Sequence, residues 1–223
     1  MEIDRTARRI LGSLIEKRWT TPEAYPLTLN SLVLACNQKS NRDPETQLEE
    51  FLVEGCLYQL RLSELIMVVE RDTGRAVRYS ERLSDKLDLS RQQQAIVAEL
   101  MLRGPQTVGE LLRRCERMAH FENEGEVENI LRGMAERHWA KLLPREAREK
   151  HPRWTHLFAP ANEAPEERAA PAASATAPSA ELRPSAAPLK APWSDEIASL
   201  RAEIDALRAE VAELRGRLDR AGA

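Results

Sequence analysis

Apolar residues in the first 60 positions follow a helical period and then give way to two short runs. Three helices are predicted: one over residues 3–15, one from the capping residue Thr28 to Cys36, and one through residues 53–60. The runs at 65–69 and 76–79 flank a turn at 72–74 and predict a β-hairpin. Three helices followed by a hairpin is the order of a winged-helix domain, which we place at residues 1–86.

The same order of elements is predicted again over residues 87–158. The segment 26–36 returns as 105–115, with Pro, Thr, Leu and Cys in register. Two helices of this half should begin with capping boxes, in which a hydroxyl and the side chain three residues on satisfy each other's backbone N–H groups, at Ser90 with Gln93 and at Thr107 with Glu110. A third helix through residues 127–134 and strands near 140–143 and 153–158 complete the repeat. The predicted fold class is therefore mainly α with small β-hairpins, arranged as tandem winged-helix domains.

The composition changes after residue 158. Residues 159–193 are rich in Ala, Pro, Ser and Glu with almost no large apolar side chain, which predicts a disordered linker. Residues 194–220 return to helical spacing, with β-branched residues or Leu at the a positions and Leu at every d position of a heptad, a pattern that favours a parallel two-stranded coiled coil. The dimerisation residues would be Ile197, Leu200, Ile204, Leu207, Val211, Leu214 and Leu218.

The charges beside this heptad stripe agree with a parallel homodimer, since Glu occupies the g positions and Arg the e positions. The alternative is that the amphipathic helix folds back onto the domains of its own chain.

Composition narrows the function without identifying it. The net charge of −3 means that a nucleic-acid interface would have to rest on local patches. The three cysteines form no CxxC pair and lie in apolar helical patterns, which indicates reduced core thiols in a cytosolic protein. No stretch approaches the roughly 18 apolar residues of a membrane span, and the charged N-terminus lacks the core of a signal peptide. We therefore expect a soluble, cytoplasmic protein.

No pattern of an enzyme is present. The four histidines are not spaced as metal pairs, and the Gly-Pro-Gln-Thr sequence at 104–107 is a helix end followed by a cap, not a phosphate-binding loop. We expect no catalytic residue, no metal and no cofactor.

Several segments are similar to the signature segments of the bacterial YceH family. They are Ile-Glu-Lys at 15–17, Thr-Thr-Pro-Glu-Ala-Tyr-Pro-Leu-Thr-Leu-Asn at 20–30, Ala-Cys-Asn-Gln-Lys-Ser-Asn-Arg-Asp-Pro at 35–44 and Met-Leu-Arg-Gly-Pro-Gln-Thr-Val-Gly-Glu-Leu at 101–111. The resemblance covers roughly residues 5–158 and implies a tandem winged-helix fold with no established biochemical role. The third helix departs from the family pattern at Phe51, Leu52, Gly55 and Tyr58, where small or polar residues are usual.

The leading functional hypothesis is DNA-associated regulation, with phosphate contacts made by the wings and the second helices. The candidate phosphate- or partner-binding residues are Lys39, Arg42, Arg75, Arg78, Arg113, Arg114, Arg148 and Lys150. For the polar run at 37–44, which includes Lys39 and Arg42, two interpretations stay open: it binds phosphate or carboxylate, or it caps helix ends and ties the two domains together.

The third helices argue against simple groove reading. Residues 43–64 hold six acids and one base, and residues 122–137 hold five acids and two bases. The alternative hypothesis is a protein-interaction adaptor whose tandem domains bind a partner helix or peptide.

Overall fold

A computed structural model describes residues 1–69, 76–145, 149–160 and 163. The first half of the chain contains helices α1 (Arg5–Thr20), α2 (Leu29–Cys36) and α3 (Glu50–Leu62), followed by strands β2 (Ile66–Val69) and β3 (Arg78–Glu81). A 3-10 turn η1 (Pro22–Ala24) and the two-residue strand β1 (Leu27–Thr28) join α1 to α2. The predicted helices and the hairpin of this half are confirmed, whereas β1 was not anticipated.

The second half begins after a short helix α4 (Leu83–Lys86). It contains α5 (Arg91–Arg103), α6 (Val108–Cys115), α7 (Glu124–Glu136), β4 (Ala140–Leu142) and β5 (Trp154–His156). The fold is therefore mainly helical with small antiparallel sheets, as predicted. The proposed linker 159–193 falls almost entirely, and the helix 194–220 entirely, outside the described residues, as do Arg75 and Arg148.

Local hydrogen bonds explain where the helices begin. Thr28 accepts from the backbone N–H of Ser31 at the start of α2. Both predicted capping boxes are present, at Ser90 for α5 and at Thr107 for α6. Helix α5 ends at Gly104, whose positive φ of 68° is a conformation that glycine adopts without steric cost. The boundaries that the sequence predicted best are thus the ones set by neighbouring residues.

Each half closes with an antiparallel sheet. The first has three strands in the order β1-β3-β2, so that β3 lies in the middle with Tyr79 opposite Leu27 and Val68. The second has two strands, β4 and β5, and Gln106 forms an additional bridge to Trp154 on β5. Both sheets therefore tie the segment before the second helix of their half to the hairpin that follows the third helix.

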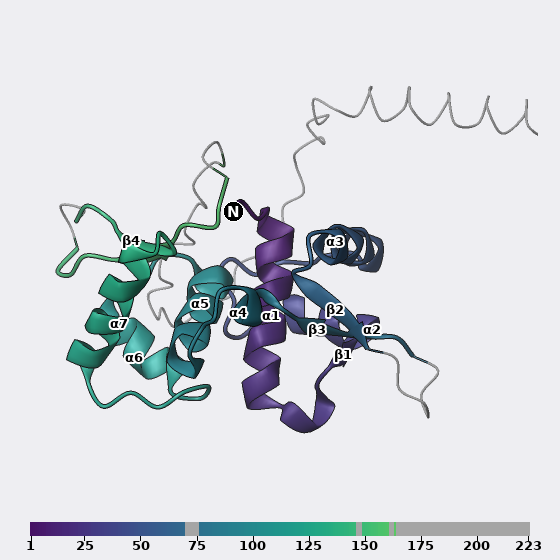
Figure 1. Ribbon diagram of the computed structural model, residues 1–223, viewed down its shortest axis with the longest axis horizontal. Helices are drawn as coiled ribbons and strands as arrows, with labels where there is room; N and C mark the ends of the chain where they lie inside the picture. Colours follow the sequence, from purple (N-terminus) through teal and green to yellow (C-terminus); the bar gives the residue numbers. More distant parts are fainter. Residues whose placement is uncertain (70–75, 146–148, 161–162, 164–223) are drawn as a thin grey trace, which may run out of the picture. The chain divides into compact units, whose positions relative to one another are not determined.

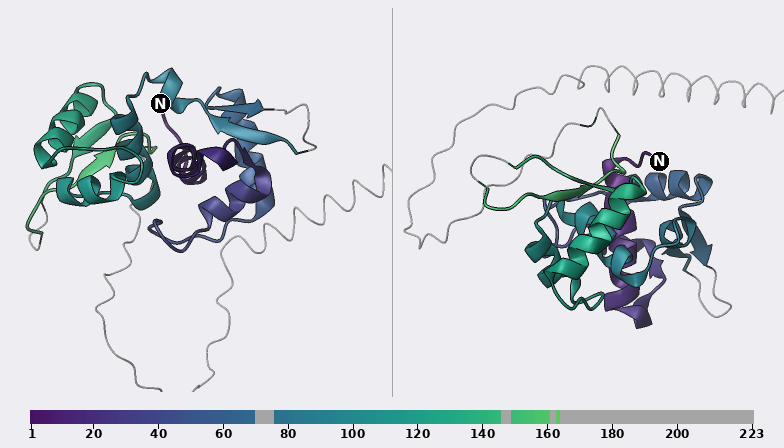
Figure 2. Two further views of the ribbon diagram at one scale, coloured as in Figure 1. Left: turned by 90° about the horizontal axis from the view of Figure 1, so that it is seen from below. Right: turned by 60° about the vertical axis from the view of Figure 1, so that its left-hand side comes forward.

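Helix α1 lies in the centre of the described residues, with α5 packed along it (Figure 1). Viewed down α1, the second half of the chain lies on one side and α2, α3 and the first sheet lie on the other (Figure 2, left). Every residue of α1 from Ala7 to Glu16 is buried as a result. A Cβ atom added at Gly12 would lie 3.0 Å from Cγ of Leu102, so glycine is what permits the close approach to α5. The two halves consequently share one continuous core.

Candidate functional site

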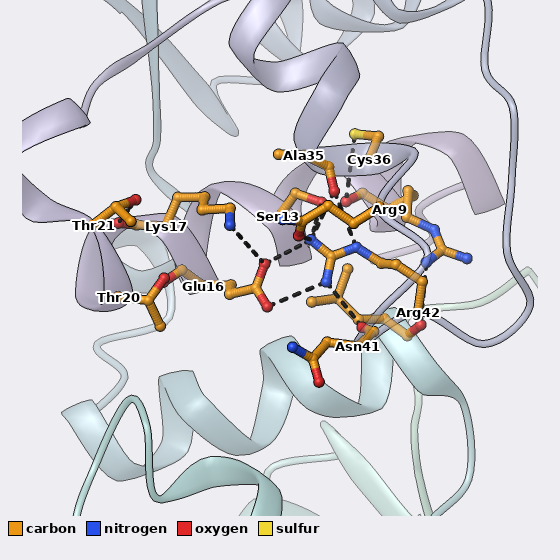
Figure 3. Close-up of polar contacts among 12 residues, drawn as sticks. Arg9, Ser13, Glu16, Lys17, Thr20, Thr21, Ala35, Cys36, Asn41 and Arg42 are labelled. Carbon is orange, nitrogen blue, oxygen red and sulfur yellow. Dashed lines mark hydrogen bonds and ion pairs between the residues drawn. The ribbon is translucent and has the colours of Figure 1, made fainter.

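A cluster of charged side chains with little solvent exposure lies between the two halves, and Figure 3 shows its part around Glu16 and Arg42. Glu16 on α1 receives hydrogen bonds from Nη2 of Arg42 at 2.6 Å and from Nη1 of Arg117 at 2.5 Å. The other end of the Arg117 guanidinium donates to Glu99 on α5 at 2.5 Å. The side chains of Glu16, Arg42 and Glu99 are fully buried, whereas Arg117 is 30% exposed. A continuous ionic chain thus joins α1 to α5.

The electrostatics of this cluster favour the charged form of the Glu16 carboxylate. Burial by itself would raise the pKa of Glu16, but hydrogen bonds and positive charge from Arg42 and Arg117 outweigh it and hold that pKa below its ordinary value. Burial lowers the pKa of the neighbouring Lys17, whose ammonium lies 4.0 Å from the Glu16 carboxylate. Every carboxylate of the cluster faces a guanidinium, so the arrangement is suited to holding the halves together.

Several residues of the polar run at 37–44 make contacts within the protein, as in one of the two interpretations that the sequence left open. Arg42 donates to the backbone carbonyl of Ala35 at 2.7 Å in addition to Glu16. Asn41 accepts from Arg103 at 2.6 Å, and the backbone N–H of Asp43 donates to the carbonyl of Leu102. Arg42, predicted as a ligand-binding residue, is therefore committed to contacts within the protein, and its guanidinium does not reach the surface. Lys39 of the same run is exposed.

The remaining predicted binding residues differ in their exposure and in their hydrogen-bond partners. Arg78 donates to the backbone carbonyl of Pro26 at 2.8 Å, and Arg114 donates to Gln106 at 2.6 Å. Arg113 and Lys150 are exposed. The structure brings none of these five, Lys39 included, into contact with another of them among the hydrogen bonds and ion pairs of the described residues.

Two of the three cysteine thiols, those of Cys36 and Cys115, are buried. The described part of the chain contains no group of three or more His, Cys, Asp or Glu side chains that could hold a metal ion. Burial raises the pKa of the Cys36 thiol to about 11, and it raises the pKa of Cys115 as well. Both thiols therefore favour the protonated form at neutral pH.

Helix α3 exposes several large apolar side chains, which the site prediction did not include. Its solvent side exposes Phe51 (67%), Leu52 (47%), Tyr58 (62%) and Leu62 (63%), whereas its inner side buries Val53, Leu57 and Leu60. The third helix of the second half, α7, is exposed at polar residues instead, namely Glu124, Asn129, Arg132 and Glu136. The signal in the sequence was the departure of residues 51–58 from the family pattern, but only the structure shows that these residues face solvent.

The described residues thus define a small, mainly helical protein with an apolar helix face and an internal ionic cluster. The chain belongs to the family described as protein of unknown function, DUF480, which matches residues 3–149. This membership confirms the resemblance predicted from the sequence, because YceH-type proteins are UPF0502 members.

Its relatives in that family are UPF0502 proteins. The relative from Citrifermentans bemidjiense is 49% identical over 158 residues, covering 70% of this chain and 73% of the relative. The relative from Geobacter sulfurreducens is 49% identical over 166 residues, covering 73% and 75%. A relative from Xanthomonas campestris pv. campestris is 39% identical over 226 residues, covering 99% of this chain and 96% of its own, so that this alignment includes the C-terminal heptad segment.

No described helix is long and apolar enough to cross a membrane.

Proposed function

We propose that this protein is a tandem winged-helix adaptor that binds another protein and carries out no reaction. The observation that supports this proposal is the solvent face of α3, where Phe51, Tyr58 and Leu62 are each more than half exposed. In a winged-helix domain the third helix is the usual recognition element. An apolar face on that element suits a protein surface, because contiguous exposed apolar side chains on a soluble protein mark interaction sites.

The charges of the third helices favour the same conclusion. Glu50 and Glu54 are exposed on α3, and Glu124 and Glu136 are exposed on α7. Affinity for DNA comes mainly from Lys and Arg that neutralise phosphates, so acidic third helices would be repelled by the backbone that they have to approach.

Three arginines of the described residues form ion pairs within the protein that take up their positive charge. Arg42 and Arg117 belong to the cluster around Glu16. Arg153 pairs with Glu110 at 2.6 Å and with Glu149 at 2.5 Å. These ion pairs leave less positive charge for a ligand than the number of arginines suggests.

DNA-associated regulation is the second candidate function, and one observation favours it. Lys141, Arg145 and Lys150 are exposed around the β4–β5 hairpin, the predicted second wing, and Arg113 is exposed on α6. Wings and second helices could contact phosphates without base reading.

Dimerisation through the heptad segment 194–220 would complete the adaptor. A parallel coiled coil would place two copies of α3 in one molecule, and two linked sites raise the apparent affinity for a bivalent partner through effective concentration.

Purification of the full-length protein from its native cell, with and without nuclease, tests the proposal together with a DNA titration. We expect a protein that stays bound after nuclease treatment and rebinds at a defined stoichiometry when purified. We also expect no binding of labelled duplex DNA at low salt. Capture that nuclease abolishes, or duplex binding that weakens steeply between two salt concentrations, would instead establish the DNA function.

A further inference from the structure

The exposed apolar residues of α3 form a stripe with a defined spacing. Phe51, Gly55, Tyr58 and Leu62 follow one another at intervals of four, three and four residues, which places them on one side of the helix. This stripe lies opposite the buried residues Val53, Leu57 and Leu60. A helix that is apolar on two opposite sides is normally covered on both, and here only the inner side is covered by the described residues.

We propose that the α3 stripe is the docking site for an amphipathic helix of a partner protein, with Lys or Arg along one flank of its apolar side. This inference rests on the proposed adaptor function and specifies the chemistry of the partner. The spacing carries the choice of a helix, because four-three-four intervals match the a and d positions that pack side by side between two helices. An extended peptide repeats every two residues and would not present its side chains in this register.

The length of α3 sets the length of the partner. Its 13 residues extend over about 20 Å, at 1.5 Å per residue. A partner helix of about three to four turns would therefore cover the stripe. Segments of this size are a recurring recognition mode, in which the apolar face of one helix lies along an apolar surface.

The charge of the partner follows from what lies beside the stripe. At 100° per residue, Glu50 and Glu54 fall on one flank, and neither forms an ion pair within the described part of the chain. Arg61 follows on the same flank in the last turn, while Leu52 and Gln59 lie on the other flank. A partner with cations opposite the first two turns of α3 is thus complementary in charge, whereas an acidic flank there would be repelled.

Gly55 in the middle of the stripe allows a close approach. A Cβ atom added at this position meets no atom within 4 Å. The glycine is therefore not required by the packing of the protein itself, and the absence of a side chain leaves a shallow place for a large side chain of the partner. Gly133 on α7 is equally open, with no atom within 4 Å of an added Cβ. The chain thus supplies a matched pair of positions for a test.

The experiment measures the binding of synthetic helical peptides to the full-length protein by fluorescence anisotropy at low salt. One 21-residue peptide carries a Leu/Ile heptad stripe with Lys on one flank, a second carries Glu on that flank, and a third is a scrambled sequence of the first. We expect the Lys-flank peptide to bind at least 10-fold more tightly than the other two. Gly55→Arg should weaken its binding at least 10-fold, whereas Gly133→Arg should leave it unchanged. Thermal unfolding of both variants verifies that the fold is retained.

Each of the following results would overturn the inference. Equal binding of the Lys-flank and Glu-flank peptides would show that charge does not select the partner. Equal effects of Gly55→Arg and Gly133→Arg on the affinity for the Lys-flank peptide would show that the peptide does not bind at the stripe. A mass doubling in light scattering that Gly55→Arg abolishes would assign the stripe to a second copy of α3. Tighter binding of a peptide of residues 194–220 than of the Lys-flank peptide would assign it to a C-terminal segment. The adaptor function is tested separately. A purified partner protein that binds equally well to Gly55→Arg would support the adaptor function and would show that the stripe is not the binding site.

Discussion

Replacement of Glu16 by glutamine should destabilise the protein by about 3 kcal/mol. The change keeps the shape of the side chain and removes the charge that faces Arg42 at 2.6 Å. Loss of one partner from a buried ion pair typically costs about 3–5 kcal/mol, because the other charge is left uncompensated out of water. Arg42 has no exposed side-chain surface. Arg117 is 30% exposed and keeps Glu99 as a partner, so we expect the lower end of this range.

Equilibrium unfolding in urea, followed by circular dichroism, measures this loss as a lower midpoint at an unchanged slope. For a protein of this size a loss of 1 kcal/mol lowers Tm by roughly 2–4 °C, so a fall of about 6–12 °C is expected. The control is Glu128→Gln, which breaks a surface pair with Arg132 whose side chains are 44% and 67% exposed. It should cost less than about 0.5 kcal/mol.

Two outcomes would refute this view of the cluster. A loss below about 1 kcal/mol for Glu16→Gln would show that Arg42 tolerates the loss of its counter-charge. The second test is the double variant Glu16→Leu with Arg42→Met. Removal of a whole buried ion pair is often neutral or stabilising when the replacements pack well. The ionic explanation would be contradicted if the double variant lost more free energy of unfolding than the two corresponding single variants lose when their losses are added.

Three further predictions concern other parts of the molecule. Gly55→Arg and Gly133→Arg should each stabilise the protein by about 0.5–1 kcal/mol, because glycine is a poor helix former and both positions are open; a lower Tm would show a hidden contact. The folded pKa of Glu16 lies below its unfolded value of about 4.3, so its contribution to the free energy of unfolding is complete above that pH and is lost as pH falls through the folded pKa. The urea midpoint of the wild type should therefore fall from pH 7 to pH 4 and pH 3, and that of Glu16→Gln should fall less. Equal falls for the two proteins would contradict this prediction. Ile204→Lys with Leu207→Lys should yield monomers in light scattering, and an unchanged dimer mass would place the dimer contact on another surface.

The elements predicted well are those determined by nearby residues. The capping boxes at Ser90 and Thr107 are complete within four positions, so the sequence contains all of their hydrogen-bonding partners. Strand β1 is different. It consists of Leu27 and Thr28 and exists only because it pairs with Tyr79 and Arg78, about 50 residues further along the chain. No local propensity could indicate so short a strand.

The candidate site shows the same division. The role of Arg42 stayed undecided in the sequence because its carboxylate partner, Glu16, lies 26 positions away and a charged residue in a polar loop is usually exposed. The apolar character of Phe51 and Tyr58 was visible in the sequence. The residues on the buried side of α3 are enough to predict a helix, however, so the sequence did not show that Phe51 and Tyr58 face solvent. Which side is covered depends on how α1 and α2 pack against it, and that arrangement is a property of the fold.

The ionic cluster and the α3 stripe are connected through the run at 37–44. The side chain of Asn37 donates to the carbonyl of Leu48 at 2.9 Å and accepts from its N–H at 2.8 Å, one residue before the N-cap of α3. Further along the run, Arg42 is held by Glu16, and Asp43 is hydrogen bonded to the carbonyl of Leu102 at the end of α5. The segment that leads into α3 is therefore fixed to both halves of the chain. Since α7 presents polar residues where α3 is apolar, the second half would contribute to the proposed recognition by holding α3 in place. Preorganisation of this kind raises affinity by lowering the entropy that binding costs, which is a physical reason for burying charges between two halves that already share an apolar core.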